Sequence, residues 1–100
     1  MKHNVKQFNY LGHTITFDTT DGMMINATEM SRAFGKRPAK WLELPSTKEY
    51  INTLEAVRLS DRLIITVNGV GTWMHEDVAI EFARWLSPKF AIWCNDRIKE

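Results

Sequence analysis

The chain has 100 residues, of which 44% are apolar and 25% are charged, and its formal net charge is +1. A chain of this length and composition is expected to form one domain with a modest core, which excludes a disordered protein. No apolar run approaches the roughly 20 residues that cross a bilayer, there is no signal peptide, and a single cysteine excludes an internal disulfide, so we expect a cytoplasmic protein.

The N-terminal part of the chain predicts a β-hairpin and a short strand. Alternating residues over Val5–Tyr10 and His13–Asp18 flank a Leu11–Gly12 turn, and Met23–Ile25 follows as a third, shorter strand.

Two short helices joined by a tight turn are expected next. Asn26 opens the first helix with a capping box, in which Glu29 reaches back to the cap. Gly35 predicts the end of this helix in a left-handed conformation, and Pro38 suits the first turn of a second helix that runs through Leu42. Two short helices around a glycine turn have the shape of a helix-turn-helix.

The second half predicts a longer helix, a hairpin and two final helices. Ser46 and Glu49 indicate a second capping box, which would start a helix ending near Leu59. The predicted hairpin pairs Leu63–Val67 with Val70–Met74 around Asn68-Gly69. The last two helices are expected at Glu76–Leu86 and, restarted by Ser87-Pro88, up to the C-terminus. This order gives an α+β fold, and because the last helix has no stop signal we expect residues 1–100 to be a single domain cut from a longer protein.

A cluster of positive charge lies on the two short helices. Arg32, Lys36, Arg37 and Lys40 stand in this stretch with no acidic residue between Met30 and Leu42. The last three occupy the turn and the first turn of the second helix, from which side chains can reach base edges in a major groove. Their positive charges could neutralise phosphates, and the planar guanidinium of Arg37 could donate hydrogen bonds to a guanine edge. The alternative interpretation is a helical corner with a solvated basic face.

Five short motifs carry a family resemblance. They are Asn-Ala-Thr at 26–28, Phe-Gly-Lys at 34–36, Trp-Leu at 41–42, Gly-Thr-Trp at 71–73 and Ala-Arg-Trp-Leu-Ser-Pro-Lys-Phe-Ala at 83–91. In this order and spacing, over residues 23–97, the chain resembles the KilA-N domain. The resemblance implies a DNA-binding domain of phage antirepressors, prophage genes and large DNA viruses, and hence a bacterial host cell. It also implies a fold similar to the fungal APSES transcription-factor domains, with a helix-turn-helix and a β-hairpin wing.

Carried over to this chain, the resemblance implies a recognition region at Lys36–Lys40 and a wing at Ile65–Trp73. The loop of this wing departs from a DNA-binding pattern, since residues 67–71 contain neither lysine nor arginine. Contact there would have to come from backbone amides, Asn68 or Thr72. The predicted double-stranded DNA-binding residues are Arg32, Lys36, Arg37, Lys40, Asn68 and Thr72.

Other functions are open at this stage. The near-neutral net charge keeps a protein-interaction module that docks a repressor or another viral protein as an alternative, and other domains of a longer parent protein are further expected partners. RNA binding lacks an exposed aromatic platform, because each tryptophan has a core role by its spacing.

We expect no enzyme, no cofactor and no metal site. The three histidines are too dispersed for a zinc site, and Cys94 lies on the apolar face of the last helix as a packed thiol. The acidic residues Glu76, Asp77 and Glu81 suit the start of a helix better than a nuclease site.

Overall fold

The computed structural model describes residues 4–20, 22–67, 69 and 71–100, and within them the chain forms one five-stranded sheet and five helices. The strands are β1 (Val5–Tyr10), β2 (His13–Asp18), β3 (Met24–Asn26), β4 (Ile64–Val67) and β5 (Gly71–His75). The helices are α1 (Ala27–Arg32), α2 (Pro38–Leu42), α3 (Pro45–Arg58), α4 (Glu76–Leu86) and α5 (Pro88–Ile98). The α+β class and the predicted element order are confirmed.

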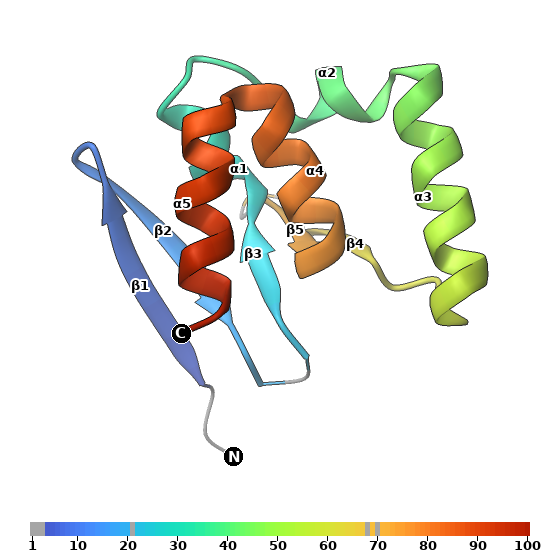
Figure 1. Cartoon of the computed structure of the whole chain (residues 1–100), viewed down its shortest axis with the longest axis horizontal. Coiled ribbons are helices and arrows are strands. Elements are labelled where there is room, and N and C mark those ends of the chain that lie inside the picture. The colour runs from blue at the N-terminus through green and yellow to red at the C-terminus, as the bar shows by residue number, and fades with distance from the viewer. Residues whose placement is uncertain (1–3, 21, 68, 70) are drawn as a thin grey trace.

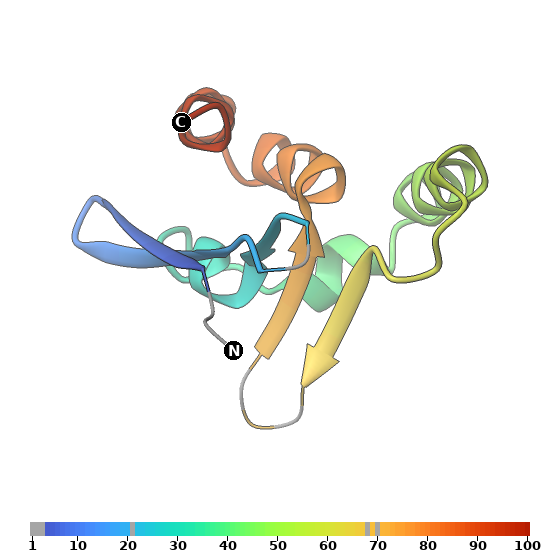
Figure 2. The same cartoon turned by 90° about the horizontal axis from the view of Figure 1, so that it is seen from below.

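The short strand β3 joins the two halves of the chain. It pairs with β2 through Phe17↔Ile25 and, on its other edge, with β5 through Ile25↔Met74. The strand order is therefore β1-β2-β3-β5-β4, and each neighbouring pair is antiparallel. Because β3 holds β5 in the sheet, the β4–β5 hairpin is fixed at one end and projects from the body at the other, as Figure 2 shows.

Helices α4 and α5 pack side by side over one face of the sheet, and the free end of the β4–β5 hairpin projects away from them (Figures 1 and 2). Their apolar residues recur at helical spacing, so each helix presents one face to the core. The large apolar side chains that are fully buried in the core include Ile15, Phe17, Ile25, Met30, Met74, Val78, Phe82 and Phe90. No helix in the described part of the chain combines the length and the apolar character that a membrane span requires.

The predicted cap at Asn26 is half confirmed. Its side chain accepts a hydrogen bond from the Glu29 backbone N–H at 3.0 Å, as expected for an N-cap. The Glu29 side chain does not reach back to Asn26. Its Oε1 instead accepts from the backbone N–H of Thr16 at 2.7 Å, because the neighbouring strand β2 offers a donor within reach. The carboxylate thus joins α1 to the sheet.

The second predicted capping box, Ser46 with Glu49, is wrong. Helix α3 begins at Pro45, so its cap position is Leu44, two residues before Ser46, and the Leu44 side chain makes no capping hydrogen bond. Proline has a fixed φ that suits the first helical position and no N–H to satisfy, so it starts the helix without a polar cap. Ser46 is then already helical and cannot take the extended conformation of a cap.

Helix α3 lies at the edge of the molecule, beside α2 and away from the β1–β2 hairpin (Figure 1). Polar contacts tie it to the start of α4: Tyr50 Oη donates to the Asp77 carbonyl at 3.3 Å, and Arg58 Nε lies 3.0 Å from Asp77 Oδ2. Leu59 follows the helix with a φ of 53° and is 91% exposed. Leu59 is therefore solvated, at the end of a helix that lies on the opposite side of the molecule from the β1–β2 hairpin.

Cys94 is fully buried in α5, as expected for a packed thiol. Burial raises the pKa of this thiol from 9.0 to about 12. The folded protein keeps a proton that the unfolded chain releases, so the Cys94 contribution to stability is complete below pH 9.0 and is lost as the pH rises to about 12. We expect the native protein not to react with a thiol reagent at pH 8 and to react fully in denaturant. Rapid stoichiometric labelling of the native protein would contradict this.

Candidate nucleic-acid interface

The connection between α1 and α2 is a defined corner held by backbone hydrogen bonds. Gly35 has a φ of 63°, its N–H donates to the Arg32 carbonyl at 3.4 Å, and the Lys36 N–H donates to the Ser31 carbonyl at 3.2 Å. This pair of bonds is a Schellman motif, in which a left-handed residue ends the helix. Arg37 then takes an extended conformation before Pro38. We call Arg32, Lys36, Arg37 and Lys40 the basic corner.

Aromatic contacts fix the corner to the body of the domain. The ring of Phe34 lies 5.0 Å from that of Phe90 and 6.2 Å from that of Tyr10, measured between centroids. On the other side of the turn, the ring of Trp41 lies 5.2 Å from that of Phe82. The apolar sides of both helices thus face inward, and the charged side chains between them are left at the surface.

Three members of the basic corner are exposed and unpaired. Arg32, Arg37 and Lys40 all lie at the surface, and none of them has an ion pair with an acidic side chain in the described part of the chain. An unpaired guanidinium or ammonium keeps its donors for an outside acceptor, such as a phosphate oxygen or a base edge.

Lys36 has an internal contact that the sequence did not reveal. Its Nζ lies 4.7 Å from the centroid of the Trp85 ring and 3.5 Å from the Trp85 carbonyl oxygen. Trp85 belongs to the last turn of α4, where the helix dipole and the free carbonyls favour a cation. The contact places the charge of Lys36 at the corner, beside the C-terminal end of α4.

Lys89 is a basic residue near the corner that the sequence prediction did not include. It is exposed in the first turn of α5, next to Phe90, whose ring touches Phe34 of the α1–α2 connection. The signal that could have found it was its place in the Ser-Pro-Lys-Phe stretch of the family motif.

The β4–β5 hairpin occupies the place of the predicted wing. Val67 pairs with Gly71, so residues 68–70 connect the strands, and Asn68 lies outside the described residues. Thr72 is half-buried, and its backbone N–H already donates to Thr28 Oγ1 at 3.0 Å. Its hydroxyl lies 3.4 Å from that of Thr66. The Thr72 amide is thus committed to the fold, and its hydroxyl contacts β4 across the hairpin.

Thr28 and Gly71 bring the hairpin and α1 into close contact. Gly71 has a φ of 137°, and a Cβ at this position would lie 2.8 Å from Thr28 Oγ1. The Asn-Ala-Thr stretch at 26–28 therefore has a structural role here: Asn26 caps α1, and Thr28 binds β5. Through these contacts the hairpin is fixed in orientation relative to the basic corner.

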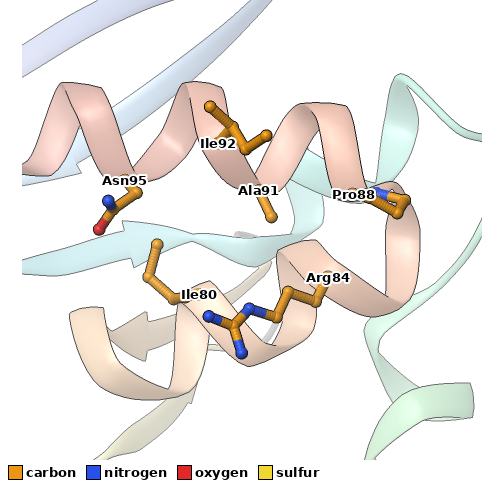
Figure 3. Close-up of a pocket in the computed structure, with 6 residues that line it drawn as sticks. All are labelled: Ile80, Arg84, Pro88, Ala91, Ile92 and Asn95. Carbon is orange, nitrogen blue, oxygen red and sulfur yellow. The ribbon is translucent and has the colours of Figure 1, made fainter.

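A separate groove lies between α4 and α5 (Figure 3). It has a volume of about 470 Å³, and Arg84 at its edge is paired with Glu81 at 3.1 Å. Its lining is mostly apolar and comprises Ile80, Arg84, Pro88, Ala91, Ile92 and Asn95. A groove of this chemistry does not select phosphates, so the basic corner is the better candidate for a nucleic-acid contact. Among the described residues there is no group of three or more histidine, cysteine, aspartate or glutamate side chains that could hold a metal ion.

The fold and the basic corner define a small α+β domain with a helical corner beside a projecting hairpin. The KilA-N domain family matches residues 6–100, and the chain belongs to this family of DNA-binding domains. It is similar to Protein kilA of Escherichia phage P1, with 34% identity over 87 residues, covering 84% of this chain and 33% of that protein. The chain thus spans about a third of the length of this relative. No solved structure matches the chain. The resemblance found in the sequence is confirmed, and it fits a phage regulatory or DNA-binding role.

Proposed function

We propose that the chain binds duplex DNA through the basic corner, as a module of a phage or prophage regulatory protein of the antirepressor type. The observation that carries the proposal is that Arg32, Arg37 and Lys40 of the corner have no acidic partner among the described residues. Outside the corner, Arg58, Arg84 and Arg97 each pair with a carboxylate, and Arg62 is the one arginine there without such a pair among the described residues. Both corner arginines lack one. Lys40 also lacks one, as do the described lysines outside the corner, so the contrast rests on the arginines.

In this proposal α1 and α2 act as a helix-turn-helix. Helix α2 has 5 residues, which at about 1.5 Å per residue makes it a short rod, so its first turn is the part that meets a groove. Arg37 and Lys40 lie at this turn and would approach base edges, whereas Arg32 and Lys36 would contact phosphates. The small net charge means that attraction to DNA depends on this local cluster more than on the field of the whole domain.

The β4–β5 hairpin would act as a wing of secondary importance. Its strands carry the Thr72 hydroxyl, and its connection carries Asn68, which is proposed from the sequence alone. Neither has a charge, so each would add a weak polar contact. Its fixed packing on α1 would orient the wing relative to the corner.

The test is a gel-retardation titration of random and selected duplexes with a charge-reversal variant, Lys36→Glu/Arg37→Glu/Lys40→Glu. We expect its affinity to fall by about a hundredfold or more near 0.1 M salt, because neutralised phosphates supply most of the binding free energy. The dependence of log K on log salt should also flatten by roughly 0.9 for each phosphate that the variant no longer neutralises.

The matched control is Lys6→Glu/Lys48→Glu/Lys99→Glu, which changes the net charge by the same amount at three exposed lysines outside the corner. We expect this control to bind within a few-fold of the wild type. Circular dichroism must show both variants folded. Equal binding by the wild type and the corner variant would refute the proposal, and equal loss in both triple variants would show that total charge matters and the corner does not.

A further inference from the structure

The turn between β1 and β2 has a leucine where its backbone favours other residues. Tyr10 pairs with His13, so Leu11 and Gly12 form a two-residue turn, with φ values of 51° and 86°. A turn with positive φ at both positions favours Asn-Gly or Asp-Gly, because a leucine Cβ is crowded in the left-handed region. Asn9 Oδ1 accepts from the Gly12 N–H at 3.1 Å and stabilises the turn from outside it.

Packing does not explain the leucine either. Its side chain is 77% exposed, so the fold gains little from its apolar surface. Asparagine would suit both the backbone conformation and the solvent better. A residue that is unfavourable for the fold in two respects is a candidate for a contact made outside the fold.

The turn lies beside the basic corner. Tyr10, the residue before Leu11, has its ring 6.2 Å from that of Phe34 and 4.8 Å from that of Phe90. Phe34 immediately precedes Gly35 and Lys36 at the α1–α2 connection. Figures 1 and 2 agree in placing the tip of the β1–β2 hairpin next to this connection. The tip therefore lies near enough to the corner for one long ligand, such as a duplex, to reach both.

We propose that Leu11 is a further DNA-contacting residue, an apolar tip that packs in the minor groove next to the groove entered by the basic corner. This inference rests on the proposed function. Apolar side chains contact the sugars and base edges of the minor groove, and some insert between base steps there. The hairpin would thus add a second, uncharged point of contact on the same duplex.

The test uses Leu11→Asn, with Leu59→Asn as its matched control. Leu59 is the other exposed leucine with a positive φ, and it lies at the remote end of α3. We expect both variants to melt at or above the wild-type temperature, since asparagine tolerates this conformation. On a selected duplex, Leu11→Asn should bind three- to tenfold more weakly with an unchanged salt dependence, whereas Leu59→Asn should bind like the wild type. Hydroxyl-radical footprinting should show loss of one minor-groove protection with Leu11→Asn.

The outcomes separate the two proposals. Wild-type affinity of Leu11→Asn, together with loss of binding by the corner variant, overturns this inference and leaves the proposed function standing. Wild-type binding by the corner variant overturns the proposed function. A lower melting temperature of Leu11→Asn assigns the leucine a structural role and overturns the inference, as does an equal loss of affinity in both asparagine variants.

Discussion

Replacing Gly71 with alanine is expected to lower the free energy of unfolding by roughly 2–4 kcal/mol. Two physical effects contribute. The backbone at Gly71 has a φ of 137°, which L-residues rarely adopt, and the added Cβ would lie 2.8 Å from Thr28 Oγ1 and 3.1 Å from Thr28 Cβ. The clash is with the side chain that joins α1 to β5, so relaxation would weaken the Thr72–Thr28 hydrogen bond. Chemical denaturation followed by tryptophan fluorescence measures the change.

A double-mutant cycle separates the two effects. Thr28→Ala alone should cost about 1 kcal/mol because it removes the hydrogen bond to Thr72. In Gly71→Ala/Thr28→Ala the Oγ1 is gone, so the combined cost should be smaller than the sum of the single changes, and the remainder reports the backbone strain together with the tight contact to the Cβ of residue 28. Gly69→Ala is a useful comparison, because its φ is also positive at 78° but nothing lies within 4 Å of its added Cβ. Strict additivity in the cycle would contradict the proposed clash.

Truncation of Phe90 is the second change with a large expected effect. Phe90 is fully buried, and its ring lies 4.8 Å from that of Tyr10, 5.0 Å from that of Phe34 and 5.7 Å from that of Trp93. Phe90→Ala removes the ring that contacts the β1–β2 hairpin, the α1–α2 connection and a neighbouring ring of α5, and it leaves a cavity. We expect the free energy of unfolding to fall by about 3–5 kcal/mol, a large part of the stability of a domain this size.

Ile92→Ala is the matched control for Phe90→Ala. Ile92 lies two residues further along the same helix and is 67% exposed, so its truncation should change the stability by less than about 0.5 kcal/mol. Similar melting temperatures for Phe90→Ala and the wild type would contradict the assigned packing of the corner on α5.

The sequence predicted the elements whose ends carry local signals. Gly35 ends α1 by the expected left-handed turn, and Ser87, in an extended conformation, accepts from the Phe90 N–H at 3.3 Å and starts α5. These signals depend on neighbours within a few residues, so they can be read without the fold. The α4 helix follows its predicted bounds for the same reason, since its periodic apolar residues and its acidic first turn are local.

The features that the sequence did not predict depend on partners distant in the chain. Glu29 binds a strand 13 residues before it, and Lys36 contacts a tryptophan 49 residues after it. The pairing of β3 with β5 likewise joins two segments whose proximity no local pattern encodes. At α3 the sequence offers two possible starts of the helix, a cap at Ser46 and a first helical residue at Pro45. The helix starts at Pro45.

The basic corner was predicted as a cluster, and the structure adds the state of its members. Sequence spacing placed Lys36, Arg37 and Lys40 on one turn, but it did not distinguish a cation held by α4 from cations free of acidic partners in the described residues. The sequence predicts only that Leu11 is a turn residue, since neither its positive φ nor its nearness to the corner is visible in the sequence.

Selection of bound sequences from a randomised duplex pool tests the central claim most directly, because it asks at once whether the domain binds duplex DNA and whether it prefers a sequence. The wild type is expected to enrich one short common site, and the Lys36→Glu/Arg37→Glu/Lys40→Glu variant none, while Lys6→Glu/Lys48→Glu/Lys99→Glu enriches the wild-type site. No enrichment by the folded wild type, or the same site enriched by the corner variant, would contradict sequence-preferring binding through the basic corner.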